Sequence, residues 1–300
     1  MSENWKKIFF YQPKFDKKSK ISHAQLPTVM TFKNFFRVFF ATRDKNNFSN
    51  IYCADFKIVK DKVLLIKEYQ KSILTKGNIG NFDEHGVYPS SIIKYKKNFF
   101  LYYIGWTKGY TSPLFYASIG LAKSKNCLNF KKYSKSPIFQ RGDRDCCLVT
   151  SPFIVKNKKK FIMLYTSGYK WEKSREKITS FYDIRSAVSK DGINWDRENK
   201  PIINLSKYET NITRAVFLKN NQKKIYYCSM EKKDKKYQIN YALLKGKKYY
   251  KNKSKIFLET DNPKNTTVAY PYLFEFKEKT LMVYNGEDFG KKGFYISKAI

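Results

Sequence analysis

An acid pair stands directly beside a rare histidine in the segment NFDEHGVYPSS, residues 81–91. Asp83, Glu84 and His85 are consecutive, and the chain has only one other histidine, His23. Carboxylates and imidazole are the side chains that most often transfer protons in enzymes, because their pKa values can be tuned to the working pH. The segment predicts acid–base chemistry if the fold directs it into a cleft. The alternative is a hydrated loop in which Asp83 caps its own strand.

An internal repeat indicates where this segment lies. Five segments share a short apolar run that carries a proline or, once, an alanine, and we number the repeats one to five by these reference residues. The spacings between them are 62, 63, 63 and 56 residues, and a repeat that recurs through a whole chain is typical of propellers and arrays. The reference residues are Pro27, Pro89, Pro152, Ala215 and Pro271.

Each reference segment precedes two further strand-like segments, with turns rich in lysine, asparagine and glycine between them. A fourth strand is visible at 129–139 and at 194–205, and the N-terminal segment 4–13 resembles these fourth strands. We therefore predict an all-β fold, a five-bladed β-propeller that forms one domain over residues 1–300. The N-terminal strand would complete the last blade and remove an open sheet edge. The alternative is a β-sandwich.

The first strand of each blade lines the channel of a propeller, so residues just before the reference positions should converge at one mouth. His23 and His85 both lie four positions before their references. Asp83 and Glu209 both lie six before, so we expect them to face each other across the mouth. Such a pair is what glycosidic bond cleavage needs. The catalytic candidates are Asp83, Glu209, His85, His23, Glu84 and Asp145.

Both histidines could instead do no more than bind backbone groups around the channel. A metal held by the two histidines and a carboxylate is only weakly indicated by residue type. We therefore predict no metal and no cofactor.

A second group of residues has the chemistry to hold a sugar or its anionic group. Second-strand ends reach a propeller mouth, flat aromatic rings suit the C–H faces of sugars, and arginine binds phosphate or carboxylate. The long polar segment 167–181 could form a lid over the mouth. The substrate-binding candidates are Arg43, Asp44, Trp106, Trp171, Arg214, Tyr270 and Glu287.

The composition is strongly basic, with 60 Lys and Arg against 25 Asp and Glu and a net charge of +35. This charge favours an anionic partner such as a sugar phosphate, a nucleotide sugar, an acidic glycan or an anionic membrane surface. A solvated lysine-rich surface explains it equally well. No arginine-rich stripe or RNA-type motif is present, so we expect no nucleic-acid partner.

The five cysteines show no metal-type pairs, and no apolar run approaches 18 residues. We therefore expect reduced thiols and a cytoplasmic protein, able to rest on the inner face of the membrane.

The chain resembles known five-bladed glycoside hydrolases. The turn SKDGINW (189–195) and the fivefold layout resemble the arabinanase/β-xylosidase kind, of the family 43 superfamily. The blocks SHAQLPT, FDEHGVYPSS, LYYIGWT and YNGEDFGKKGF resemble a bacterial family of glycosidase-like propellers often encoded among surface-polysaccharide genes. The catalytic acids of arabinanase-type enzymes would fall at Leu26, Ser151 and about Thr213. None of these is an acid, so that triad does not carry over.

The leading hypothesis is a carbohydrate-active enzyme that cleaves, transfers or phosphorolyses a glycosyl group. Its substrate would be an anionic or activated sugar of surface-polysaccharide or nucleotide-sugar metabolism. The alternative is a non-catalytic sugar-binding or scaffold propeller that has lost the glycosidase triad.

Overall fold

The computed structural model describes residues 3–15, 21–111, 114–175, 177–198, 200–218, 220–252, 256–260 and 267–300. Within them the regular secondary structure consists of β-strands and one short 3-10 helix, η2 (Glu287–Gly290). Among the described residues no helix has the length and apolar character that crossing a bilayer requires.

Each repeat supplies a meander of antiparallel strands. Repeat one forms β2 (Ser22–Thr31), β3 (Phe36–Arg43), β4 (Ile51–Val59) and β5 (Lys62–Glu68). Repeat two forms β6 (Gly86–Tyr95), β7 (Asn98–Lys108), β8 (Phe115–Ser124) and β9 (Lys131–Lys132). Repeat three forms β10 (Leu148–Lys156), β11 (Phe161–Ser174), β12 (Lys177–Ser189) and β13 (Asp196–Arg197). Repeat four forms β14 (Glu209–Leu218), β15 (Asn221–Glu231), β16 (Tyr237–Lys245) and β17 (Lys248–Lys251). Repeat five forms β19 (Ala269–Phe276), β20 (Lys279–Asn285) and β21 (Phe294–Ala299), next to β18 (Ile256–Leu258) and β1 (Glu3–Tyr11).

Hydrogen bonding divides these strands into four sheets. Repeats one and two each form a four-stranded sheet, and repeat five forms a five-stranded one, in the order β18-β1-β21-β20-β19. Repeats three and four join into one eight-stranded sheet, because Tyr182 of β12 pairs with Asn211 of β14. The all-β prediction is confirmed, whereas the count of five separate blades stays a prediction.

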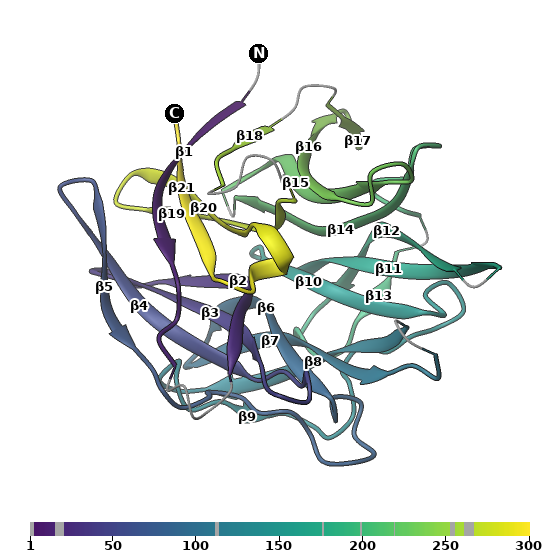
Figure 1. Ribbon diagram of the computed structural model, residues 1–300, viewed down its shortest axis with the longest axis horizontal. Coiled ribbons are helices and arrows are strands. Elements are labelled where there is room, and N and C mark those ends of the chain that lie inside the picture. Colours follow the sequence, from purple (N-terminus) through teal and green to yellow (C-terminus); the bar gives the residue numbers. More distant parts are fainter. Residues whose placement is uncertain are drawn as a thin grey trace.

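The first strands of the repeats lie at the centre of the molecule. They contact one another in the cyclic order β2, β6, β10, β14, β19 and back to β2. Figure 1 shows the sheets spreading outward from this centre. Any side chain at the start of a first strand is therefore close to the axis around which the sheets are arranged.

The N-terminal strand pairs with the last strand of the chain, as the sequence predicts. β1 runs antiparallel to β21 from Trp5 opposite Ala299 to Tyr11 opposite Phe294, and the two strands lie side by side in Figure 1. Trp5 and Tyr11 are buried. Pairing the first and last segments covers a sheet edge that would otherwise be open.

Aromatic side chains fill the space between neighbouring sheets. Because successive residues of a strand point to opposite faces, Tyr103 of β7 packs with Phe39 of repeat one and Tyr102 packs with Met163 of repeat three. Strands with buried residues on both faces explain the high content of Phe and Tyr.

A β-bulge recurs in all five first strands, next to the reference residue. In repeats one, three, four and five the pairing register with the second strand shifts across the residue before the reference and the reference itself. In repeat two the shift comes one position later, between Pro89 and Ser91. In four repeats the residue before the reference has a positive φ, between 51° and 59°. These residues are Leu26, Ser151, Arg214 and Tyr270.

The segment 167–181, expected to be a lid loop, is instead largely β-structure. β11 and β12 pair from Phe161 opposite Ser189 out to Ser174 opposite Lys177. Cross-strand hydrogen bonds satisfy the backbone of this polar stretch, which is why it forms a long hairpin and not a loose cover.

Candidate functional site

A cavity of about 510 Å³ lies where the first strands begin, close to the molecular centre. Its size falls in the range of small-molecule sites, roughly 300–1,000 Å³. First strands, second-strand ends and third strands from different repeats all contribute to its wall. The residues most relevant to binding are Arg43, Tyr88, Trp106, Lys108, Tyr182, Asn211, Tyr237 and Tyr270.

The bulges of the first strands build the inner part of this cavity. The residue before the reference position lines it in four repeats, as Leu26, Tyr88, Ser151 and Tyr270. Leu26, Ser151 and Tyr270 stand in the bulge with a positive φ, whereas Tyr88 is regularly paired. Positive φ at a residue other than glycine is strained, and such strain concentrates at functional sites. The repeated bulge therefore marks this layer as the candidate binding site.

Two cations face the cavity on the side of repeats one and two. The guanidinium of Arg43 lies over the rings of Tyr88 and Trp106, 5.2 and 5.4 Å from their centroids. It donates hydrogen bonds to Gln25 Oε1 at 2.9 Å and to the Asn47 carbonyl at 2.8 Å. Lys108 lines the same cavity. These contacts fix the Arg43 head group while leaving it at the cavity wall.

Four tyrosines supply hydroxyl groups around the cavity. Burial raises the pKa of Tyr88, Tyr182, Tyr237 and Tyr270. The hydroxyls are therefore protonated near neutral pH and can donate hydrogen bonds to a ligand.

Among the described residues that line the cavity, none is aspartate or glutamate. The three positions where arabinanase-type enzymes would place their acids do line it, as Leu26, Ser151 and Thr213. The Thr213 hydroxyl lies 3.0 Å from that of Thr166, within hydrogen-bond distance. The three positions at which the resemblance would put acids thus carry apolar or hydroxyl side chains at the cavity wall.

Arg214, expected to bind substrate, is buried among the first strands and only 1% exposed. It donates to Ser90 Oγ at 2.7 Å, to Thr28 Oγ1 at 2.9 Å and to the Pro27 carbonyl at 3.2 Å. Burial lowers its pKa to about 10. Its side chain does not line the cavity, so its contacts link repeats one, two and four beside the axis.

Asp83 lies outside the cavity, in a buried group of three side chains. Its carboxylate is 1% exposed, pairs with Lys132 Nζ at 2.6 Å and accepts a hydrogen bond from the Tyr103 hydroxyl at 3.2 Å. A Cβ on Gly105 would lie 2.6 Å from the Asp83 Cβ, so only glycine leaves room for this packing. The carboxylate joins the loop before β6 to β7 and β9.

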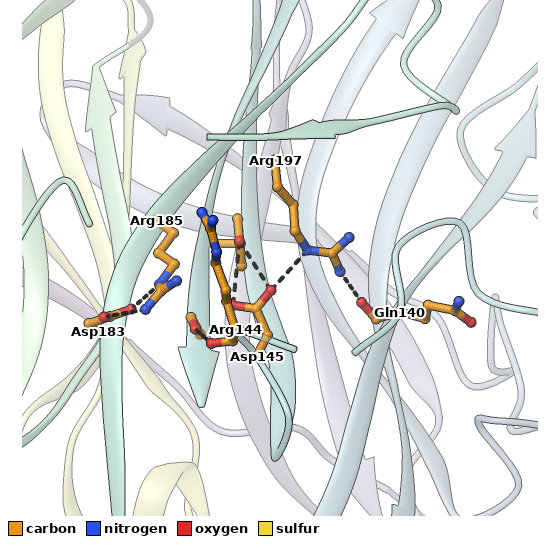
Figure 2. Close-up of polar contacts among 8 residues, drawn as sticks. Gln140, Arg144, Asp145, Asp183, Arg185 and Arg197 are labelled. Carbon is orange, nitrogen blue, oxygen red and sulfur yellow. Dashed lines mark hydrogen bonds and ion pairs between the residues drawn. The ribbon is translucent and has the colours of Figure 1, made fainter. Parts of the chain in front are cut away.

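Equivalent groups recur in repeats three and four. Asp145, fully buried, pairs with Arg197 Nε at 2.9 Å and lies 3.3 Å from the Tyr165 hydroxyl. Figure 2 shows Arg197 reaching between Asp145 and Gln140. In repeat four Glu209 pairs with Lys251 and lies near Tyr227.

We call these groups the acid–tyrosine–cation sets. Their members are Asp83, Tyr103 and Lys132, then Asp145, Tyr165 and Arg197, then Glu209, Tyr227 and Lys251.

The expectation that Asp83 and Glu209 face each other across the mouth is therefore wrong in its geometry. Neither residue lines the cavity, and each carboxylate is paired with a cation of its own repeat. Their equivalent positions arise because the same kind of structural contact recurs in repeats two, three and four. A role in catalysis for the six proposed residues stays a prediction.

The two histidines lie near the rim, outside the cavity lining. His23 has a positive φ of 68°, and its Nδ1 lies 2.7 Å from Ser22 Oγ. Burial, with the charges of Arg43 and Lys291, lowers its pKa to about 4.

His85 accepts a hydrogen bond from the Lys108 backbone at 3.3 Å, and its ring lies 5.7 Å from that of Trp106. Burial also lowers the pKa of His85. Both imidazoles are thus neutral near pH 7.

The other sequence candidates are spread over several loops. Glu84 accepts from the Gly80 backbone at 2.7 Å, and Asp44 caps its own turn by accepting from Asn46 and Phe48. Trp171 packs 5.5 Å from Tyr116 and does not line the cavity. Glu287 begins η2, but its side chain lies outside the described residues.

Of the binding candidates, Arg43, Trp106 and Tyr270 do line the cavity. Among the described residues, no group of three His, Cys, Asp or Glu side chains is placed to hold a metal ion.

Sequence reasoning missed most of the cavity wall. Ser151 could have been found, because it is one of the positions where the resemblance would put an acid, and Tyr88 because it directly precedes the reference residue Pro89. Tyr182, Tyr237 and Lys108 carry no such signal, since they come from other strands that only the folded chain brings to the centre.

Comparisons with known proteins place the fold. No protein-family model matches the chain. The relative named Uncharacterized protein Rv1502, of Mycobacterium tuberculosis strain H37Rv, is 27% identical over 280 residues, with 91% of each chain covered. A putative glycosidase of Bacteroides thetaiotaomicron has a TM-score of 0.72 at 13% identity, over 98% of this chain and 96% of that one.

A third match comes from work entitled "The GH130 family of mannoside phosphorylases contains glycoside hydrolases that target beta-1,2 mannosidic linkages in Candida mannan". Its TM-score is 0.69 at 12% identity, over 99% of this chain and 94% of that one. The predicted likeness to glycosidase propellers is therefore confirmed for the fold. At such low identity the likeness carries no catalytic residue across.

Proposed function

We propose that the protein binds a carbohydrate bearing a carboxylate or phosphate group in the central cavity, without hydrolysis by a carboxylate pair. The observation that carries this proposal is the wall itself, where Arg43 and Lys108 stand among aromatic residues and no described lining residue is acidic. A cationic, acid-free site favours an anionic ligand over a neutral one. The shared fold with glycosidases supports a sugar as the ligand.

The two halves of the cavity suit the two halves of such a ligand. Arg43 is held by Gln25 and by the Asn47 carbonyl, so its remaining donors can pair with an anion at little entropic cost. The tyrosines that line the cavity from other repeats offer ring faces and protonated hydroxyls to a sugar ring. Tyr182 and Tyr270 are partly exposed and suit this role.

Ordinary glycoside hydrolysis needs two carboxyl groups beside the scissile bond, one as acid and one as base or nucleophile. Asp83 and Glu209, the candidates for this role, are engaged by Lys132 and Lys251. This pairing favours the binding function over the hydrolytic one.

Phosphorolysis is the second candidate. Its nucleophile is phosphate, which needs no carboxylate base and which Arg43 and Lys108 could hold. The leaving oxygen would take up the proton that the attacking hydrogen phosphate loses, relayed through a hydroxyl such as that of Tyr237 or Tyr270, which is neutral before and after the step. The cations of the cavity support phosphorolysis and binding without catalysis equally. Only a measurement of turnover distinguishes these two functions.

Calorimetric titration tests the binding proposal. The ligand panel would contain glucuronate and galacturonate oligosaccharides, sugar 1-phosphates and nucleotide sugars, each with its neutral counterpart. We expect an anionic member to bind and its neutral counterpart to bind at least tenfold more weakly. Arg43→Met should remove most of this preference, whereas Arg175→Met, on an exposed hairpin end, should keep it. Equal binding of charged and neutral members would overturn the proposal.

The same panel, incubated with the protein in water and with inorganic phosphate, tests turnover. We expect the parent protein to hydrolyse the panel no faster than the Asp83→Asn and Glu209→Gln variants do. Phosphate-dependent release of a sugar phosphate would favour phosphorolysis, and hydrolysis that both variants abolish would restore the acid pair.

We further propose that the ligand belongs to surface-polysaccharide or nucleotide-sugar metabolism in the cytoplasm. The basic charge and the resemblance in the repeat blocks support this. Glycan profiling of cells that lack the gene tests it, since an unchanged surface polysaccharide would contradict the assignment.

A further inference from the structure

The hairpin formed by β4 and β5 exposes an unusual amount of apolar surface. Among the described residues ten large hydrophobic side chains are exposed, and four of them lie on this hairpin. They are Val59, Leu64, Leu65 and Ile66, with exposed fractions of 43, 41, 43 and 49%. Scattered single apolar residues need no explanation, but four within eight positions form a patch.

This patch lies at the edge of a sheet and away from the cavity. β5 is the last strand of the order β2-β3-β4-β5, and Figure 1 shows the hairpin at the rim of the molecule. Glu68, at the far end of β5, accepts hydrogen bonds from Tyr11 and the Lys14 backbone. The exposed side chains lie between that contact and the hairpin turn.

Lysines surround the apolar residues. Lys57 is opposite Leu64 and Lys62 is opposite Val59 in the strand pairing, and Lys60 lies in the turn. Two lysines of repeat five reach the same turn: Lys277 Nζ donates to the Ile58 carbonyl at 3.1 Å, and Lys279 Nζ pairs with Asp61 at 2.6 Å. The patch is thus an apolar strip within a cationic frame.

We propose that the β4–β5 hairpin docks the protein on an anionic lipid surface. The side chains of Leu64, Leu65 and Ile66 enter the boundary between head groups and acyl chains, and the lysines pair with lipid phosphates. Apolar insertion combined with a basic frame is the combination that holds proteins on anionic bilayers.

Charge complementarity selects the membrane over a second copy of the chain. Pairing two β5 edges would bring two lysine-rich strips together between molecules of net charge +35 each. Lysine on an edge strand is a common device against such pairing. An anionic surface turns the same charges into attraction.

Vesicle flotation tests the proposal with phosphatidylcholine vesicles that either lack or contain 30% phosphatidylglycerol, at physiological salt. We expect binding only to the anionic vesicles. The Leu64→Thr/Ile66→Thr variant should reduce the bound fraction about fivefold to tenfold, and Thr keeps the strand preference. The matched control Ile79→Thr/Tyr208→Thr, at exposed apolar positions elsewhere, should bind like the parent.

Lysine substitutions distinguish docking through the β4–β5 hairpin from nonspecific electrostatic attraction of the whole basic protein to the vesicles. Lys57→Gln/Lys62→Gln should weaken binding by about the same factor, whereas Lys158→Gln/Lys159→Gln, in the exposed β10–β11 turn, should not. Absent binding by the parent, or equal loss in both charge variants, overturns the proposal. So does a parent dimer in light scattering that the Leu64→Thr/Ile66→Thr variant abolishes. Far-UV circular dichroism checks that each variant is folded.

Discussion

The central cavity and the acid–tyrosine–cation sets are built from neighbouring positions of the same repeat and differ in their chemistry. The cavity uses residues next to the reference position, three of them at a positive φ in a bulge, and its described lining has cations, tyrosines and no acids. The sets use residues six or seven positions before the reference, and in each an acid pairs with a cation beside a tyrosine. The cavity presents the charges of Arg43 and Lys108 to a ligand, whereas the acid–tyrosine–cation sets pair their charges within the chain.

This difference teaches how to interpret an acid that recurs in a repeat. A contact that stabilises the repeating unit can recur in several repeats, whereas a catalytic group is needed at only one place in the molecule. The recurrence of Asp83, Asp145 and Glu209 therefore points to structure before catalysis. The acids tie the loops before the first strands to the outer strands β9, β13 and β17.

The largest expected effect is on the set with the most buried carboxylate. Asp145→Asn removes the buried charge that faces Arg197 and should lower the free energy of unfolding by about 2 kcal/mol, because Arg197, 31% exposed, can turn partly to water. Urea unfolding measures this. Asp143→Asn, two residues away and exposed, should stay within about 0.5 kcal/mol of the parent. If Asp145→Asn were as stable as the parent but no longer bound ligand, Asp145 would belong to the binding site, and the contrast between the cavity and the acid–tyrosine–cation sets would be wrong.

The next effect concerns the cavity. Ser151→Asp places a carboxylate in the acid-free wall, at a positive φ that aspartate tolerates. We expect affinity for an anionic sugar to fall at least tenfold, about 1.4 kcal/mol, with affinity for its neutral counterpart little changed. Calorimetric titration measures both, and exposed Ser136→Asp is the control. Unchanged affinity would mean that the ligand binds elsewhere.

A smaller effect is expected at the more accessible set. The Glu209 side chain is itself 11% exposed, whereas that of Asp145 is fully buried, so water already screens the pair between Glu209 and Lys251. The loss in unfolding free energy of Glu209→Gln should be about 1 kcal/mol, below that of Asp145→Asn in the same urea assay. If Glu209→Gln lost as much unfolding free energy as Asp145→Asn, burial of the acid would not determine how much each set stabilises the fold.

The smallest effect is a pH dependence from His23. Its pKa, about 4 in the folded protein, lies below the ordinary value of 6.5, because burial and the neighbouring cations oppose its protonation. The unfolded chain binds this proton first, so stability should fall as the pH falls from about 6.5 to 4. His23→Gln should reduce that slope in unfolding curves recorded across this range. If the pH dependence of stability were the same in His23→Gln, it would come from the carboxylates and not from His23.

Much of the fold could be predicted because repeat spacing and apolar alternation are local properties of the chain. Strands at each reference residue, and the N-terminal strand beside the last one, follow from these patterns. Strand length at the rim could not be predicted, since β9 and β13 have only two residues each and cross-strand partners set where pairing stops.

The sequence by itself determined the strand order, the equivalence of repeat positions and the absence of acids at Leu26, Ser151 and Thr213. Only the tertiary structure decided which equivalent positions reach the centre. Tyr88 and Ser151 line the cavity, Ser151 from a bulge, while Asp83, five residues before Tyr88, pairs with Lys132 outside the cavity. The reason is physical: a buried carboxylate must find a cation, and that cation lies about 50 residues further along the chain.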